Sequence, residues 1–267
     1  MQGRRKMTKI QQESEQAKRY MLKTIKKTNL VALTQDNVAR VEAMIQNDAA
    51  YLNAVSKNSK PKNGEGGSTA YWMCALEKYI NNKDRTTWDY KQIIEHAVCA
   101  VDKDNSTHLN ADNVGRKQIT DRIAKIDPNE LTEYLKDPHK PGLKWNDYWL
   151  FNKIAAQTKP TDKKYKPRTN KSFASKFCHY ACFYLFEGKP EQDNYSIYDS
   201  VVKEALPLYA KYYDINIKEY NLEDYIDYSK IIEKILEMSG NNISKNGFDH
   251  LLWYYFKGRN IKNIKTE

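Results

Sequence analysis

The 267-residue sequence predicts an all-α protein. Apolar residues recur every three or four positions in most segments, whereas the strict alternation that marks a half-buried strand is scarce, as are Asn-Gly hairpin turns. Hydrophobic residues make up 40% of the chain and include 20 Tyr, 7 Phe and 5 Trp, which is ample for a sizeable core. We therefore expect about ten packed helices.

Helix boundaries are placed by capping residues, proline and glycine. Thr34 and Ser68 each stand at the start of an apolar-periodic segment, Thr87 is expected to cap the helix that carries Trp88, and Pro128 suits a first helical turn. Residues 58–68 are polar and glycine-rich, so they predict a loop. Helices are expected over residues 8–28, 34–52, 68–81, 87–98, 111–126, 128–136, 145–157, 172–185, 199–213, 228–238 and 245–257.

The segment 172–185 is the most informative of these helices. Its residues Phe173, Phe177, Ala181 and Leu185 are spaced four apart, which gives one apolar stripe, and Ser172 has the residue type of an N-cap. The stripe predicts that this helix is buried.

The first turn of that helix is expected to carry Lys176. Burial and neighbouring positive charge both disfavour an ammonium ion, so a lysine at this place is expected to have a lowered pKa and can act as a nucleophile. Asp199 precedes the helix that begins at Ser200, where its carboxylate can cap that helix or face a cleft.

Positive charge is concentrated in two segments. The net charge is +10, of which residues 1–33 and 153–176 contribute +7 each, so the rest of the chain carries −4. Such concentrated basic segments suit phosphate binding, although a mobile basic arm and a solvated loop would look the same. The second segment leads directly into Lys176.

Two runs carry a family resemblance, Ala174-Ser-Lys-Phe-Cys-His-Tyr-Ala-Cys-Phe183 and Ile197-Tyr-Asp-Ser-Val-Val202. They resemble the core of the helix-hairpin-helix-GPD superfamily of DNA glycosylases. Phe248-Asp-His-Leu-Leu-Trp253 resembles a late helix of the 8-oxoguanine-directed, AGOG-like branch. The resemblance covers residues 165–256. It departs from the family at residues 170–174, which lack the glycines of the hairpin, and at residues 187–194, which lengthen the interval between Lys176 and Asp199.

The resemblance implies that Lys176 is the Schiff-base lysine and Asp199 the catalytic aspartate. It further implies a two-lobed helical fold with a helix-hairpin-helix element, and excision of a flipped damaged or modified base from double-stranded DNA, with or without strand nicking. The biological setting would be base-excision repair or defence against phage with modified DNA. The residues expected to contact DNA are Lys164, Lys166, Arg168, Asn170, Lys171, Ser172 and Ser175. The candidates for the base pocket are Trp72, Trp88, Trp145, Trp149, His179 and Trp253.

The four cysteines predict neither a disulfide framework nor a metal centre. Nothing after Cys182 could supply the iron–sulfur cluster that some members of the superfamily carry. Cys178 and Cys182 lie one turn apart beside His179, but four converging ligands are needed for zinc, and buried cysteine usually packs as a small apolar residue. No cofactor is expected.

The expected organisation is a basic N-terminal helix or arm over residues 1–33, a helical lobe over 34–150 and a catalytic lobe over 151–267 whose last helices pack back. No run of eighteen apolar residues and no signal-peptide core is present, so we expect a cytoplasmic monomer without membrane contact. Two other functions stay open, a non-catalytic nucleic-acid-binding helical protein and a helical interaction module. Loss of base excision on changing Lys176 and Asp199 would separate the enzyme from the non-catalytic nucleic-acid-binding protein. Salt-sensitive nucleic-acid binding would separate these two functions from the interaction module.

Overall fold

The structure is a computed structural model, and the part of the chain that it describes is all-helical. The described residues are 25, 29–47, 56, 66–81, 88–105, 107, 109, 115–139, 147–159 and 167–267. They contain ten α-helices and no strand, apart from the isolated bridges Val31–Thr266 and Thr158–Arg168. The all-α prediction is therefore confirmed, while the predicted helix over residues 8–28 lies outside the described residues.

The helix bounds follow the predicted segments closely in the second half of the chain. The α-helices are α2 (Gln35–Ile45), α4 (Thr69–Ile80), α5 (Tyr90–Asp104), α6 (Gly115–Ile123), α7 (Pro128–Lys136), α8 (Trp149–Ala155), α9 (Lys171–Leu185), α10 (Ser200–Tyr212), α11 (Tyr225–Ser239) and α12 (Lys245–Phe256). Two 3-10 helices, η2 (Pro190–Asp193) and η3 (Ile217–Glu219), lie in the connections.

Local side-chain hydrogen bonds explain where the helices begin. The side chain of Thr34 accepts a hydrogen bond from the Asn37 amide, and that of Ser68 accepts one from the Tyr71 amide, so both residues are N-caps. The prediction that Thr87 caps the Trp88 helix is wrong. The cap of α5 is Asp89, because Asp89 and Gln92 each accept a hydrogen bond from the other's backbone in a capping box, and Trp88 precedes the helix.

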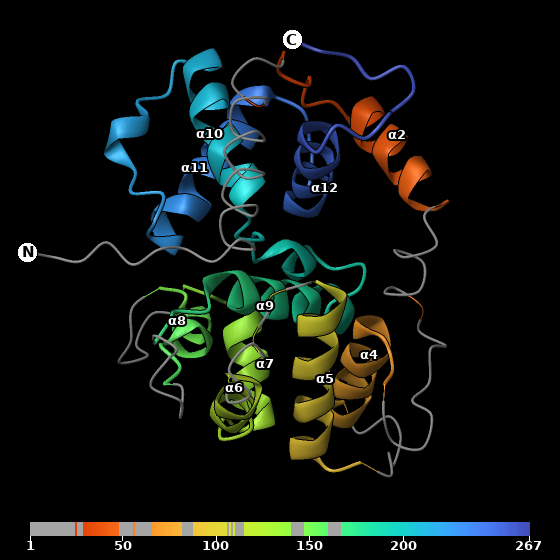
Figure 1. The fold of residues 1–267 in the computed structure, drawn as a ribbon, viewed down its shortest axis with the longest axis vertical. Helices are drawn as coiled ribbons and strands as arrows, with labels where there is room; N and C mark the ends of the chain where they lie inside the picture. Colours follow the sequence, from red (N-terminus) through yellow and green to blue (C-terminus); the bar gives the residue numbers. More distant parts are fainter. Residues whose placement is uncertain are drawn as a thin grey trace, which may run out of the picture.

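The helices form two groups, which Figure 1 shows one above the other. Helices α4 to α9 make up the first group, here called the central group, in which α9 packs against α4, α5 and α8. Helices α2, α10, α11 and α12 make up the second, here called the terminal group, in which α12 packs against α2 and α10. The chain passes between them after α9, so the end of α9 and the start of α10 lie where the groups meet.

The C-terminal tail holds α2 in the terminal group. The amide of Ala32 donates to the carbonyl of Lys265 at 3.0 Å, and the amide of Glu267 donates to the carbonyl of Leu30 at 2.9 Å. The buried side chain of Asn37 donates to both the Ala32 and the Lys265 carbonyls and accepts from the Lys265 amide. Residues more than two hundred positions apart are thereby fixed side by side.

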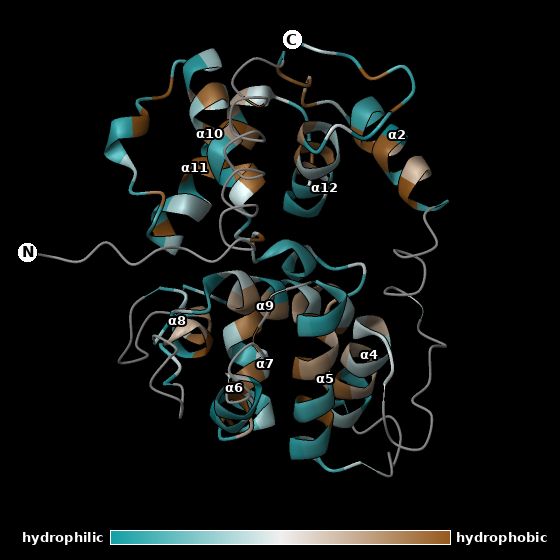
Figure 2. Ribbon diagram, in the orientation of Figure 1, coloured by the Kyte–Doolittle hydropathy of each residue, from teal (hydrophilic) through white to brown (hydrophobic). Residues whose placement is uncertain are grey.

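Each helix carries an apolar and a polar side, as the mixed brown and teal colouring in Figure 2 shows. The apolar sides meet in one connected core that includes Trp72, Phe173, Phe177, Tyr209 and Phe248, all of them at most 1% exposed. Burial of such side chains is the main favourable contribution to the folding free energy. None of the helices in the described residues has the length and hydropathy that crossing a bilayer requires.

Candidate functional site

Lys176 lies in the second turn of α9 rather than in the first. The helix begins at Lys171, with Asn170 at the N-cap position, so the prediction that Ser172 is the cap is wrong. The reason is tertiary, because the backbone amide of Asn170 donates to the Ala155 carbonyl at 2.9 Å and its side chain lies near Thr158. These contacts tie the start of α9 to the end of α8 and let the helix begin earlier.

The ammonium group of Lys176 sits in a partly buried setting at the meeting of the two helix groups. Its Nζ donates to the carbonyl oxygen of Asn105, just after α5, at 3.3 Å. Burial lowers the pKa of Lys176, the carboxyls of Asp199 and Asp249 oppose this effect, and the charge of Lys257 adds to it, with a net lowering. The lowered pKa increases the fraction of neutral amine, which is the nucleophilic form.

Asp199 caps α10 and also acts electrostatically on Lys176. Its Oδ1 accepts a hydrogen bond from the amide of Val201 at 2.7 Å, which confirms the N-cap reading of this residue. The Coulombic effect of Asp199 on the pKa of Lys176 places the two charges near one another, although they are 23 positions apart. Asp199 can therefore cap α10 and still act on the charge of Lys176.

The loop that carries Asp199 is held by hydrogen bonds from two helices. The hydroxyl of Ser175, fully buried in α9, donates to the Ser172 carbonyl at 3.0 Å and accepts from the amide of Tyr198 at 2.9 Å. From α11, the hydroxyl of Tyr228 donates to the carbonyl of Ile197 at 2.8 Å. The backbone that carries Asp199 is therefore positioned by α9 and α11.

A third titratable residue, Asp249 of α12, completes the cluster. It is 8% exposed, and its Oδ1 has no hydrogen-bond partner among the described residues. Burial raises the pKa of Asp249 well above its ordinary value, and the nearby charge of Asp199 raises it further, while Lys176 lowers it. The sequence analysis assigned Asp249 no role, and the signal that could have found it is an acidic residue among the apolar Phe248, Leu251 and Leu252 of one buried helix.

The cluster combines groups with different protonation properties within one partly buried place. Lys176 has a lowered pKa, Asp249 has a raised one, and Asp199 supplies a carboxylate to both. A lysine whose pKa is lowered by burial, beside two carboxyl groups, is suited to nucleophilic attack and to stabilising a developing positive charge. Perturbed pKa values of this kind are enriched at functional sites.

The predicted DNA-contacting residues divide into structural and surface positions. Asn170 and Ser175 are buried, and Ser175 is engaged with the Asp199 loop. Lys171 is partly exposed, donates to the carbonyl of Glu223 and lies 5.7 Å from the ring centre of Tyr198. Arg168 pairs with Thr158 in a bridge, and Ser172 lies in the first turn of α9. The remaining two, Lys164 and Lys166, lie outside the described residues.

Two of the aromatic base-pocket candidates belong to the core far from Lys176. The rings of Trp72 and Trp88 are 5.6 Å apart and both contact His96. Trp88 stands at the N-terminal end of the 15-residue α5, whereas the Asn105 carbonyl that binds Lys176 follows its other end. Because both rings contact His96, nine residues before Asn105, they lie about 13 Å from that carbonyl along the α5 axis.

The other aromatic candidates lie in three different settings. Trp149 stacks on Tyr134, with ring centres 4.3 Å apart, and Trp145 lies outside the described residues. Both ring nitrogens of His179 are hydrogen-bonded, to the Tyr195 carbonyl and to Oδ1 of Asn246, so His179 packs α9 against α12. Trp253 is partly buried in α12, one turn after Asp249, so it lies on the same helix as a member of the cluster.

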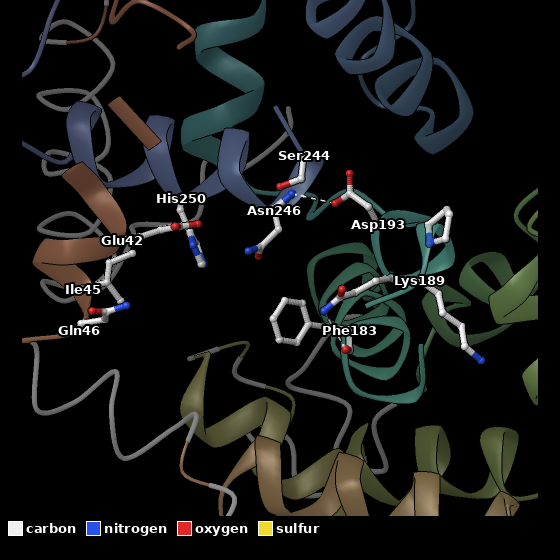
Figure 3. Close-up of a pocket in the computed structure, with 11 residues that line it drawn as sticks. Glu42, Ile45, Gln46, Phe183, Lys189, Asp193, Ser244, Asn246 and His250 are labelled. Atoms are coloured by element: carbon white, nitrogen blue, oxygen red, sulfur yellow. Dashed lines mark hydrogen bonds between the residues drawn. The ribbon is translucent and has the colours of Figure 1, made fainter. Parts of the chain in front are cut away.

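A cavity of about 480 Å³ opens where α2, α9, η2 and α12 meet (Figure 3). Phe183 of α9 and Asn246 and His250 of α12 point into it, with Glu42 and Gln46 of α2 across from them. Its volume falls within the range of about 300 to 1,000 Å³ that is typical of small-molecule sites. Its described lining is formed by Glu42, Ile45, Gln46, Phe183, Lys189, Pro190, Gln192, Asp193, Ser244, Asn246 and His250.

Metal ligands do not converge in the part of the chain that the structure describes, where no cluster of three or more His, Cys, Asp or Glu side chains could hold an ion. Cys178 and Cys182 are free thiols within the core, and burial raises the pKa of each.

Comparison with protein-family models, with curated proteins and with solved structures found no match to this chain. The site therefore has to be interpreted from its own geometry.

Proposed function

We propose that the protein is a DNA glycosylase that excises a damaged or modified base from double-stranded DNA, using Lys176 and Asp199 at C1′ of a flipped nucleotide. The observation that carries this proposal is the partly buried lysine of lowered pKa whose charge interacts with two carboxyls from other helices. The resemblance of residues 165–256 to the helix-hairpin-helix-GPD superfamily, and the meeting of two helix groups at this cluster, support it. The biological role would be base-excision repair or defence against phage with modified DNA.

In the proposed reaction, the nucleotide is extruded from the duplex so that its C1′ reaches Lys176. The neutral amine forms a bond to C1′ while the bond from C1′ to the base nitrogen breaks, and the base leaves with that electron pair and takes a proton. Positive charge develops on the sugar as the bond lengthens, and the carboxylate of Asp199 stabilises it. Loss of the amine proton and cleavage of the bond from C1′ to the ring oxygen then give an imine.

The imine determines what happens to the strand. A proton is removed from C2′, the bond from C3′ to its phosphate oxygen breaks, and the strand is nicked by β-elimination. Hydrolysis of the imine before that step leaves an intact strand with an abasic site. If Lys176 only binds phosphate, water attacks C1′ instead and the product is again an abasic strand.

The proposal is tested by borohydride trapping on a panel of duplexes that carry oxidised, alkylated or enlarged bases. Wild-type protein is compared with Lys176→Ala, with Asp199→Asn and with Lys211→Ala, which changes an exposed lysine of α10 as the matched control. A covalent adduct with wild type and Lys211→Ala that is absent with Lys176→Ala supports the lysine mechanism. Circular dichroism shows whether each variant is folded.

Alkali treatment of the same reactions covers the mechanism without an adduct. Alkali-labile abasic sites without trapping would indicate a monofunctional glycosylase. Excision that persists in both Lys176→Ala and Asp199→Asn would contradict the proposed site. Salt-dependent DNA binding without excision of any base in the panel would favour the non-catalytic nucleic-acid-binding function.

A further inference from the structure

The cavity at the meeting of α2, α9, η2 and α12 adjoins the lysine cluster along two helices. Phe183 follows Lys176 by seven residues, which is close to two helical turns, so the two residues share a face of α9 about 10 Å apart along the axis. On α12, the cavity residue His250 is the next residue after Asp249. A nucleotide whose C1′ lies at Lys176 therefore has the cavity within reach of its base.

Part of the cavity is built by the segment 187–194, which lengthens the chain between Lys176 and Asp199. Lys189, Pro190, Gln192 and Asp193 of this segment are among the lining residues. Asp193 fixes the segment to the start of α12, because its carboxylate accepts from the amides of Lys245 at 2.5 Å and Asn246 at 3.0 Å. The wall is thus part of the fold and is held by charge-assisted hydrogen bonds.

The cavity is acidic. Glu42 and Asp193 are its two carboxyls, and the side chain of Lys189 points away from it in Figure 3. Burial lowers the pKa of His250 to about 4, and His179 lowers it as well, so His250 carries no charge at neutral pH. An anion, whether a phosphate or a carboxylate, would be repelled from this space.

The polar atoms that face the cavity are suited to hydrogen bonding. The carboxylate of Glu42, an exposed residue of α2, forms neither an ion pair nor a side-chain hydrogen bond with the other described residues. The side-chain amide of Asn246 forms a hydrogen bond with Nε2 of His179, and its second polar atom is left to pair with a ligand. Phe183 adds an aromatic ring on which a flat group can stack.

We propose that this cavity is a subsite that accepts an amino- or hydroxyl-bearing substituent of the extruded base and excludes bases with an anionic substituent. The inference rests on the proposed glycosylase function, because it places C1′ of the nucleotide at Lys176. Glu42 accepts from the substituent, Asn246 forms a hydrogen bond with it through its second polar atom, and Phe183 packs against its base.

Binding of free nucleosides tests the subsite without requiring turnover. In NMR titrations that follow the side-chain amides of Asn246 and Gln46, 5-aminomethyl-2′-deoxyuridine is compared with 5-carboxy-2′-deoxyuridine. We expect the aminomethyl nucleoside to bind at least about tenfold more tightly, because its ammonium group is attracted to the Glu42 carboxylate, whereas the carboxylate of the other nucleoside is repelled by it. Glu42→Gln should reduce this ratio severalfold, whereas Glu95→Gln, an exposed carboxyl of α5, should leave it unchanged.

The two proposals fail in different ways. Equal affinity for the two nucleosides, preference for the carboxy nucleoside, or no shift of the Asn246 amide with either would overturn the subsite, whatever the protein excises. Charge-selective binding that Glu42→Gln weakens, in a protein that excises no base, would support the subsite as a nucleoside pocket and count against the glycosylase. Duplexes with the same two substituents, cleaved in the same order by wild type, would support both.

Discussion

Replacement of Asp249 by asparagine should change how stability depends on pH. Asp249 is buried in α12, its Oδ1 has no hydrogen-bond partner among the described residues, and burial raises its pKa well above the ordinary value of 3.8. Above pH 3.8 the folded protein therefore binds more protons at this residue than the unfolded chain does. The free energy of unfolding consequently falls as the pH rises from that value towards the folded-state pKa.

The size of the effect follows from proton linkage. One proton bound by the folded state and released by the unfolded chain lowers the free energy of unfolding by about 1.4 kcal/mol for each pH unit within the window. Asparagine does not titrate, so the free energy of unfolding of Asp249→Asn should rise relative to that of wild type by about 1.4 kcal/mol for each pH unit in this window. For a domain of this size, each kcal/mol corresponds to about 2–4 °C in Tm, so each pH unit between 3.8 and the folded-state pKa should separate the two proteins by several degrees.

The measurement is thermal unfolding by differential scanning calorimetry between pH 4.5 and 7.5. Glu95→Gln removes an exposed carboxyl of α5 and should run parallel to wild type over the whole range. Curves for Asp249→Asn that also run parallel to wild type would show that the Asp249 carboxyl titrates near its ordinary pKa. Such a result would refute both the burial argument and the protonated acid in the proposed site.

Three further changes test the fold around the site. Arg116→Ala should cost about 3–5 kcal/mol in urea unfolding, because its Nε lies 2.7 Å from the buried Asp102 carboxylate, which would lose its charge partner and keep only its hydrogen bonds from Thr107 and Leu109. These hydrogen bonds and the Arg116 charge hold the pKa of Asp102 below 3.8 despite its burial, so the cost should fade as the pH drops through the folded-state pKa. Phe177→Ala should cost about 3–5 kcal/mol, since its ring is fully buried in α9, and a loss under 1 kcal/mol would contradict that packing. Ser175→Ala should cost about 1–3 kcal/mol by leaving the Tyr198 amide unpaired, and it should weaken excision more than Lys211→Ala does if the Asp199 loop is positioned as described.

The all-helical class and the cap residues with local partners could be predicted from the sequence. Thr34 and Ser68 bond to amides three residues ahead, and Asp199 bonds to one two residues ahead, so neighbours in the chain are sufficient. The predicted N-caps were wrong where another nearby residue forms additional hydrogen bonds at the helix start. The N-cap of α5 is Asp89 rather than Thr87, because Asp89 forms a capping box. The N-cap position of α9 is held by Asn170 rather than Ser172, because the backbone amide of Asn170 donates to the Ala155 carbonyl at the end of α8.

The sequence by itself determined that Lys176 lies near the start of a buried helix and that Asp199 stands where it can cap the next one, because apolar periodicity and capping chemistry act within a few residues. Only the tertiary structure decided that Asp249 joins them, and that residues 187–194 form a wall of the acidic cavity. Burial and Coulomb interactions depend on which side chains are close in space, and Asp249 is 73 positions from Lys176 in the chain. A lowered lysine pKa could be anticipated from one helix, but the groups that oppose or reinforce it come from α10, α12 and the residue that follows α12.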